Sequence, residues 1–421
     1  MLGSVEAGLR SDVEAICSFE DRLPGSDAER RASNDLARQL SGPGRHAELE
    51  PVYVQPQWAV VHALHCAIAA IGSMLAVFQP AIGFALVLLA ATSAYLDLTA
   101  RHYLLRRLLF RRASQNVHSR STAPGRAARV ILCANVDAPR TGAAYNPLPV
   151  RLLNAAARRL PVATSPTRIW FWSIALLLPP LGARMAELEA GWLAAAQLPQ
   201  TLILIVAVFL LGEIALSPAS PGANANASGV AAVLEAARRL DRDPPEGLSV
   251  DVLICGGGET TMEGMRAFVR SHRGELERGS TYFVSLESVG RGDPRYVVSQ
   301  GLAVSLPLDP ELAGLCEAIE IADAGERLRP EAIRDGRISA ALVARAYGYP
   351  AIAITSREGT EALPVGHHTP GDTPSSVAPG AIERVVSFTV ELVQLLDRDL
   401  SRRASDDASA SSPVPVAAAP G

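Results

Sequence analysis

Four long apolar stretches, arranged as two closely spaced pairs, constrain this chain more than any other feature. They cover residues 59–78, 80–96, 169–183 and 190–212. A bilayer core about 30 Å thick needs roughly 20 helical residues, which the first and fourth stretches supply and the second nearly does. The third is short, although Trp170 and Trp172 resemble the aromatic anchors of membrane interfaces. Buried core helices are the alternative, but two such pairs favour four spans in two hairpins.

The distribution of arginines predicts the orientation of these spans in the membrane. The chain has arginines and no lysine, and twelve arginines lie between the second and third stretches from Arg101 to Arg159, with Arg168 directly before the third. The connection at 184–189 holds one arginine and two glutamates. The positive-inside rule therefore places the arginine-rich segment in the cytoplasm. Because the number of spans is even, the N-terminus and everything after Gly212 lie on that side too. We expect an integral protein of the plasma membrane whose soluble parts are cytoplasmic.

Composition agrees with a membrane protein and excludes some other classes. The chain has 421 residues, a hydrophobic fraction of 48% and a mean hydropathy of +0.17, which is high for a soluble protein. A net charge of −4 gives no sign of nucleic-acid binding. The five cysteines are widely spaced without a CxxC motif, which argues against a disulfide framework or a cysteine-based zinc site. This pattern is typical of a reducing compartment.

Outside the apolar pairs, helical and strand patterns alternate. Helices are indicated at 5–41, 262–271 and 339–346, and strands at 47–54, 129–134, 248–255, 281–290 and 349–355. Alternation of this kind predicts an α/β fold with a mainly parallel central sheet flanked by helices. The domain is then interrupted by the hairpins at 58–98 and 169–212, and its pieces are 1–57, 99–168 and 213–400. The tail at 401–421 is rich in Ser, Ala and Pro and is expected to be disordered.

Residues 221–240, PGANANASGVAAVLEAARRL, form a tight loop that runs into an amphipathic helix, and Ser228 is placed to cap it. The segment resembles the loop and helix of the di-zinc aminopeptidase family, which includes bacterial aminopeptidases, glutamate carboxypeptidase and the transferrin receptor. In that family the loop reads GANDNASG, and its Asp bridges two zinc ions. Here that position is Ala225. The resemblance covers most of residues 10–400 apart from the hairpins, and it implies the zinc-aminopeptidase fold.

Further motifs of the family can be located residue by residue. The run VILCANVDAP has Asn135 in the place of a zinc-binding His and keeps the following Asp137. The run CGGGETTMEG puts Gly258 at the position of the general base and Glu259 at that of a ligand. Its three glycines lack the Lys and spacing of a phosphate-binding loop. In SLESVG, Glu287 replaces a ligand Asp.

The last ligand motif of the family is His-Thr-x-x-Asp-Thr. The matching run, HHTPGDTPSSV, makes His368 the ligand candidate, with His367 beside it. Asp372 of the same run is expected to cap the helix that follows.

The resemblance implies which ligands share a metal. Glu259 and His368 would hold one zinc, Asn135 and Glu287 the other, and the residue at Ala225 would touch both. A catalytic zinc has three protein ligands plus water, and neither site reaches that number. With Gly258 in place of the base as well, we expect zinc binding to be weak or absent and peptide hydrolysis to be lost. The chain would then act in binding or scaffolding, with a peptide or protein partner in the former cleft.

Other interpretations stay open at this stage. Glu259 and His368 are either remnants that contact each other or a weak single-metal site. A working metallopeptidase would need altered ligands such as Glu263, His367 or Asp137. A transport-type protein is the third alternative, and it would use two histidines one turn apart in the first span, His62 and His65. Asp97 and Glu213, at span ends, are expected to be solvated.

Overall fold

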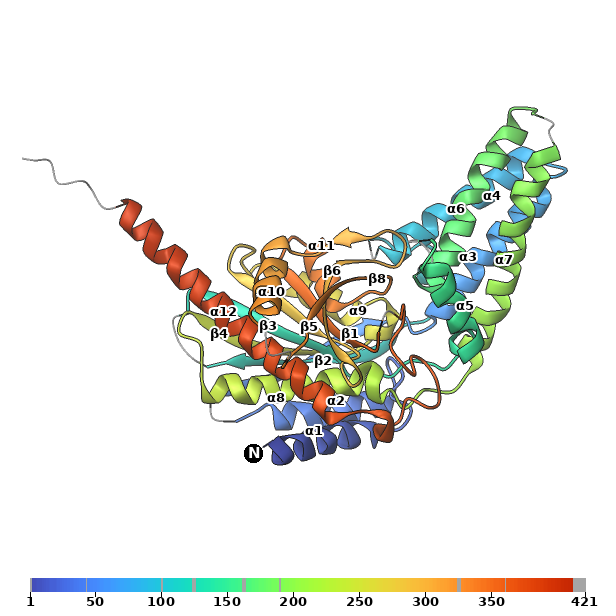
Figure 1. Cartoon of the computed structure of the whole chain (residues 1–421). Coiled ribbons are helices and arrows are strands. Elements are labelled where there is room, and N and C mark those ends of the chain that lie inside the picture. Colours follow the sequence, from blue (N-terminus) through green and yellow to red (C-terminus); the bar gives the residue numbers. More distant parts are fainter. Residues whose placement is uncertain are drawn as a thin grey trace, which may run out of the picture.

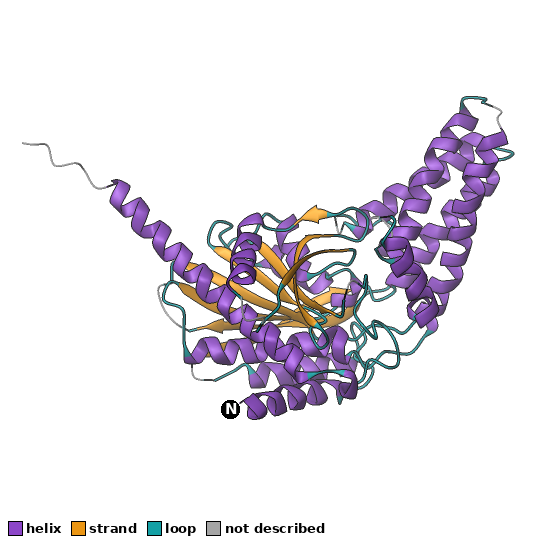
Figure 2. Ribbon diagram, viewed as in Figure 1, coloured by secondary structure: helices purple, strands orange, loops and turns teal. Residues whose placement is uncertain are grey.

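An α/β domain and a long helical bundle make up the molecule. The computed structural model describes residues 2–42, 44–99, 101–122, 126–160, 164–188, 191–323, 327–359 and 361–411. The bundle projects from one end of the domain, towards the upper right of Figure 1. Colouring by secondary structure shows strands confined to the domain, with helices around them (Figure 2). The helices of the two apolar pairs thus lie together, on one side of the domain.

One mixed sheet of nine strands runs through the domain. Its order is β1-β2-β4-β3-β5-β9-β6-β7, and β8 pairs with β6. The strands are β1 (Arg45–Val54), β2 (Arg112–Ser121), β3 (Ala128–Asn135), β4 (Leu248–Cys255), β5 (Thr281–Leu286), β6 (Asp293–Gln300), β7 (Leu306–Pro307), β8 (Glu331–Asp335) and β9 (Ala351–Arg357). All five strands that the sequence indicates are among them.

The prediction of a mainly parallel sheet is wrong. Only the central strands β4, β3, β5 and β9, together with β6 and β8, pair in parallel. The pairs β1–β2, β2–β4, β6–β9 and β6–β7 are antiparallel. The physical reason is that buried parallel strands are continuous apolar runs, whereas antiparallel outer strands carry many polar residues. β2, with the sequence RASQNVHSRS, has no apolar run that hydropathy would mark.

Helices cover both faces of this sheet. One face packs against α8 (Ser228–Arg242), and α12 (Pro379–Ser411) and α1 (Leu2–Cys17) pack on α8. The other face carries α9 (Glu263–Ser271) and α11 (Ala340–Ala346). The remaining domain helices are α2 (Asp27–Gln39), beside β1 and β2, and α10 (Pro310–Ala322), beside α12. The result is a three-layer core in which the helices indicated by the sequence are confirmed.

The bundle consists of α3 (Trp58–Leu75), α4 (Pro80–Leu98), α6 (Pro166–Met185) and α7 (Gly191–Leu216). α3 contacts α4 and α7, and α6 contacts the same two helices. Within the described residues, α3, α4 and α7 are long and apolar enough to cross a membrane. α6 is not among them, because Arg168 and Arg184 lie inside the helix together with Pro179 and Pro180. A short helix, α5 (Pro147–Ala157), lies against the base of the bundle (Figure 1).

A buried ion pair joins the bundle to the domain. Asp97, near the end of α4, is 1% exposed, and Arg106 of the short 3₁₀ turn Leu105–Leu108 is fully buried. The guanidinium donates to both carboxylate oxygens, Nε to Oδ2 at 2.9 Å and Nη2 to Oδ1 at 2.5 Å. Its Nη1 donates to the carbonyl of Thr260 at 3.1 Å. The expectation of a solvated Asp97 is therefore wrong, because the chain folds back to bury it with a partner. Glu213 is exposed, as expected.

The first part of the tail, residues 401–411, is expected to be disordered but is ordered as a helix. α12 continues to Ser411, so residues 401–411 are helical. Arg403 explains part of this extension, since it pairs with Asp399 one turn earlier and with Glu311 of α10, each within 2.6 Å. Residues 412–421 lie outside the described part of the chain.

Candidate functional site

A polar cleft of about 120 Å³ lies at the carboxyl ends of the central parallel strands. Asn135 is the last residue of β3, Gly258 and Glu259 follow β4, and Glu287 directly follows β5. His368 comes from the loop after β9. Parallel strands bring their carboxyl ends to one edge of a sheet, and ligands of α/β proteins bind there.

The structure brings together most of the site residues singled out in the sequence. The residues of this set that line the cleft are Asn135, Ala225, Gly258, Glu259, Glu287, His367 and His368. Asp137 is fully buried behind them, and its carboxylate accepts the backbone N–H groups of Gly258 at 2.9 Å and Glu259 at 2.8 Å. Asp137 therefore shapes the loop that presents Glu259. The assignment of each residue to a ligand position stays a prediction.

The loop that carries Ala225 is a π-helical turn over Ala223–Ala227. The Asp372 carboxylate accepts the N–H of Asn224 at 2.6 Å and that of Ala225 at 3.0 Å. Asp372 therefore caps this turn, and the expectation that it caps the helix after it is wrong. The Asp372 carboxylate thus fixes the backbone that leads into Ala225, while the Ala225 side chain offers no ligand atom.

Ser228 also has a role other than the one expected. α8 starts at Ser228 itself, so this residue is not its cap. Its hydroxyl donates to the carbonyl of Asn224 at 2.7 Å and accepts the N–H of Val289 at 3.0 Å. The serine thus ties the turn before α8 to the segment after β5, on which Glu287 lies.

Glu259 and His368 face each other across the cleft. His368 Nε2 lies 3.5 Å from Glu259 Oε2, and Glu259 Oε1 accepts a hydrogen bond from Asn226 at 3.0 Å. Burial, and next the nearby Asp137, raise the pKa of Glu259. Burial, reinforced by the positive charge of Arg337, lowers the pKa of His368 to about 3. The pair is thus a neutral imidazole beside a carboxyl group that burial disfavours as an anion.

Glu287 has its own partners in the cleft wall. Its Oε1 accepts hydrogen bonds from the hydroxyl of Ser285 at 2.9 Å and the N–H of Ala340 at 3.2 Å. Burial raises the pKa of Glu287 to about 7, against the opposing charge of Arg337. Arg337 is itself held by Asp335, with Nη2 2.8 Å from Oδ2. The cleft therefore combines carboxyl groups with one guanidinium whose charge Asp335 balances.

Among the described residues that line the cleft, four buried polar atoms lack a hydrogen-bond partner. They are Oδ1 of Asn135 and Nδ1 of His62, His367 and His368. The two imidazole rings stack with centroids 3.8 Å apart, and Tyr145 lies against His368 at 4.7 Å. A buried polar atom without a partner costs about 1–3 kcal/mol, so such atoms cluster where a ligand or water completes them.

Backbone strain gathers at the same place. Thr261, Met262, Ser288 and His368 adopt positive φ angles between 54° and 63°, and all four line the cleft. Residues other than glycine rarely occupy this left-handed region, and each instance costs on the order of 1–3 kcal/mol. The surrounding hydrogen bonds hold these residues in place, so the cleft wall is rigidly shaped.

The donor set does not fit a two-zinc centre. Asn135 offers only a neutral amide oxygen, Ala225 offers a methyl group, and zinc prefers thiolate, imidazole and carboxylate ligands. Within the described residues, the three metal-ligating side chains that come within reach of one ion lie elsewhere, at Glu50, His118 and His272. Three ligand candidates remain in the cleft: Glu259 and His368 lie 3.5 Å apart, and Glu287 is held by Ser285 and the N–H of Ala340.

Several lining residues come from the bundle helices or their first residues. Trp58 and His62 belong to α3, and Ser165–Thr167 to the start of α6. His62 packs between two tryptophans, with its ring 5.0 Å from Trp170 and 6.0 Å from Trp58. No local pattern predicts this, because the contact depends on how the bundle docks on the domain. The cleft is therefore shared between the domain and the base of the bundle.

Comparison with known proteins follows this geometry. Residues 211–393 match the model of Peptidase family M28. Over 92 residues the chain is 35% identical to the probable lipoprotein aminopeptidase LpqL of Mycobacterium tuberculosis, an alignment that covers 22% of this chain and 18% of that protein.

Solved structures share the fold at low sequence identity. A Zn-dependent exopeptidase from Parabacteroides distasonis superposes with a TM-score of 0.51 and 12% identity over 92% of this chain and 97% of that chain. A glutaminyl cyclase from Bacteroides thetaiotaomicron, bound to N-acetylhistamine, gives 0.52 and 14% over the same shares. The family match therefore falls on the segment that contains the loop before α8 and the later strands around the cleft, and the solved structures show that the fold is that of zinc exopeptidases.

Proposed function

We propose that this chain is a membrane-embedded M28 homologue that binds the amino end of an apolar peptide in its cleft and does not cleave it. The observation that carries the proposal is the composition of the cleft wall. Glu259 and Glu287 supply carboxyl groups, and Asn135 adds a buried oxygen without a partner. An ammonium group offers three donors and a positive charge, and that charge would favour the ionised form of the buried Glu259 carboxyl beside it.

An apolar groove beside the cleft is the evidence that the bound peptide is apolar. It has a volume of about 540 Å³ and lies between α5, α6 and α7. Tyr145, Pro166 and Thr167 line both the groove and the cleft, so the two are adjacent. A peptide with its amino group at Glu259 would reach the groove with its apolar side chains. A lipid acyl chain is the alternative occupant, and the test below separates the two.

Loss of hydrolysis follows from the assigned positions of Asn135, Ala225 and Gly258. Without a metal there is no Lewis acid and no activated water, and without a base the rate falls by a further factor of about 10²–10⁴. Gly258 and Asn135 are also sterically linked. A Cβ added at Gly258 would lie 2.4 Å from Asn135 Cγ and 2.8 Å from its Cβ. Asn135 therefore blocks the position from which a general base would extend.

For the membrane arrangement we propose that all four bundle helices cross the bilayer, with the domain in the cytoplasm. The twelve arginines between the two apolar pairs support this orientation. A single cysteine introduced at Ala127, on the domain, and one at Val77, at the far turn of the bundle, test it after Cys17 is changed to Ser. Both target residues are exposed. A membrane-impermeant maleimide on intact cells should label the second and not the first, and the reverse would refute the orientation.

Binding of the peptide is tested by fluorescence anisotropy on purified protein in detergent. The probe is a leucine-rich decapeptide labelled at its carboxyl end, with either a free or an acetylated amino terminus. The free amine should bind at least about 10-fold more tightly, because it offers a charged hydrogen bond worth roughly 1.5–3 kcal/mol. Glu259→Gln should remove this preference. The matched control is Glu246→Gln, since Glu246 is exposed and lies before β4, at the opposite end of the strand from the cleft.

Equal affinity for both peptides in the wild type would contradict recognition of the amine. Competition by a long-chain phospholipid with no effect of Glu259→Gln would assign the groove to lipid. Time-dependent shortening of the free peptide, detected by mass spectrometry, would instead support the alternative of an active metallopeptidase.

A further inference from the structure

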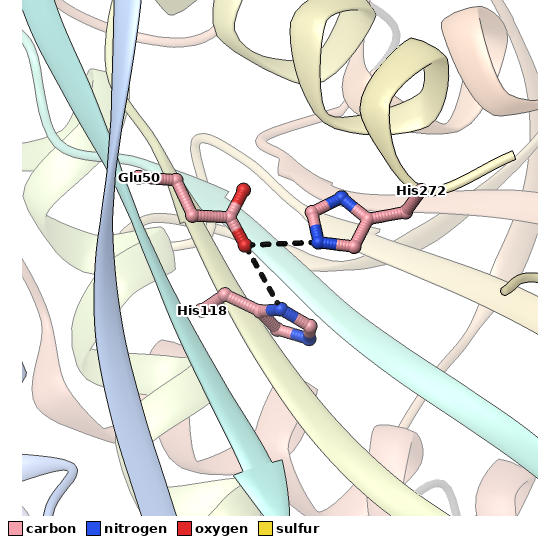
Figure 3. A group of neighbouring side chains, drawn as sticks. All are labelled: Glu50, His118 and His272. Carbon is pink, nitrogen blue, oxygen red and sulfur yellow. Dashed lines mark hydrogen bonds and ion pairs between the residues drawn. The ribbon is translucent and has the colours of Figure 1, made fainter.

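A second cluster of ligating side chains lies apart from the cleft. Glu50 comes from β1, His118 from β2, and His272 from the end of α9 (Figure 3). One carboxylate oxygen of Glu50, Oε1, lies 3.2 Å from His118 Nδ1 and 3.2 Å from His272 Nε2. The three ligand atoms all lie within 4.8 Å of one another. Two imidazoles and a carboxylate thus converge on one point where three segments distant in sequence meet.

In each histidine, the ring nitrogen that faces away from Glu50 lies near an oxygen acceptor. His272 Nδ1 lies 3.1 Å from the carbonyl oxygen of Phe268 and 3.0 Å from the hydroxyl of Ser271, so the carbonyl can accept a proton carried there. His118 Nε2 lies 3.6 Å from the carboxylate of Asp251, beyond hydrogen-bond distance, and its Nδ1 is the nitrogen within reach of Glu50. Without a metal His118 can donate from Nδ1 to Glu50; with the protons on the outer nitrogens, both nitrogens that face Glu50 would carry lone pairs, as a metal ion requires. Carboxylates and backbone carbonyls hold metal-binding histidines in this way, with the other ring nitrogen facing the metal.

In the metal-binding tautomers three acceptor atoms face one another, and they repel unless a cation lies between them. Here Arg120 supplies part of that charge. Its Nε lies 3.4 Å from His118 Nδ1 and its Nη2 lies 3.4 Å from His272 Nε2, both long for hydrogen bonds. The Arg120 side chain is 37% exposed and also lies 3.7 Å from Glu275 at the surface. Arg120 can therefore turn outward to Glu275 and leave the point open.

We propose that Glu50, His118 and His272 form a site for a divalent transition-metal ion, Zn²⁺ above all, which displaces Arg120. Two histidines and one carboxylate are a known zinc ligand set, and a water completes the fourth position. The ion would join β1, β2 and α9. Because α9 begins at Glu263, next to Met262 of the cleft wall, the metal would stabilise the segment that shapes the cleft without taking part in it.

The test uses full-length protein purified in detergent without a histidine tag, stripped with a chelator and dialysed against Zn²⁺. The wild type should retain one zinc per chain by elemental analysis, and its melting temperature should rise with added Zn²⁺. His272→Gln and Glu50→Gln should each weaken zinc binding at least about 10-fold, since even losing a partner outside the ligand set costs that much. Circular dichroism at low temperature confirms that these variants are folded.

Two further variants make the outcome decisive. Arg120→Ser should tighten zinc binding, because it removes a competing cation, whereas a purely structural role of Arg120 predicts lower stability and no change in affinity. The double variant Glu259→Gln/His368→Ala should keep its zinc. Zinc lost from that double variant and kept by His272→Gln would place the metal in the cleft and overturn the proposal. Absence of zinc binding by the wild type at millimolar concentration would overturn it as well.

Discussion

Replacing Asp97 by Ala should lower the free energy of unfolding by about 3–5 kcal/mol, the cost of leaving a buried charge without its partner. The reason lies in Arg106, which is fully buried and bonded to both oxygens of Asp97. After the substitution its charge keeps two neutral partners, the carbonyl of Thr260 and the Tyr103 ring, whose centroid is 4.7 Å from the guanidinium carbon. Because Thr260 adjoins Glu259, the loss should also weaken peptide binding in the cleft.

The assay is thermal and denaturant unfolding in detergent, followed by circular dichroism. A matched control is Glu358→Ala, which breaks an exposed pair with Arg291 at 2.9 Å and should cost less than about 1 kcal/mol. The double variant Asp97→Leu/Arg106→Met should recover most of the loss, since apolar replacement of a whole buried pair is often neutral. A change in Asp97→Ala no larger than that in Glu358→Ala would refute the reasoning.

Three further predictions concern the cleft wall. Asp372→Ala should destabilise the protein by about 1–3 kcal/mol and Asp372→Asn by less, because the carboxylate accepts two buried N–H groups; denaturant unfolding measures both. Burial would raise the pKa of Asp335, but Arg337 and Arg357 hold it at about 2, below the ordinary 3.8, so stability is present above pH 3.8 and lost as the pH falls towards 2. That loss should be about 2 kcal/mol larger in the wild type than in Asp335→Asn, measured by unfolding at each pH. Gly258→Ala should be destabilising because of Asn135, and Asn135→Gly in the same chain should recover part of the loss, whereas additive effects would contradict the contact.

The residues singled out in the sequence meet in one cleft because they follow strand ends. Asn135, Gly258 and Glu287 each lie at or just after a continuous apolar run, and parallel strands carry such positions to one edge. The outer strands could not be found in the same way. β2 and β8 are polar and pair through the backbone, so neither hydropathy nor period marks them.

Contacts between segments that are distant in the chain also could not be predicted from the sequence. The pairing of Asp97 with Arg106 depends on a short 3₁₀ turn, and that of Asp372 with the turn before α8 spans more than a hundred residues. A capping residue is recognised from the helix that follows it, and Asp372 caps one that precedes it in the chain. The approach of His62 to the cleft likewise depends on the docking of α3, which no local pattern encodes.

The most direct test of the central proposal is hydrolysis of a panel of aminoacyl-nitroanilides by the purified protein, with and without added zinc. The wild type, the single reversions Asn135→His, Ala225→Asp and Gly258→Glu, and the triple reversion are compared. We predict no turnover by the wild type or by any single reversion, because residues that act as one unit restore activity only together. Wild-type turnover that a chelator removes and Glu259→Ala abolishes would show that the chain is an enzyme and contradict the proposal.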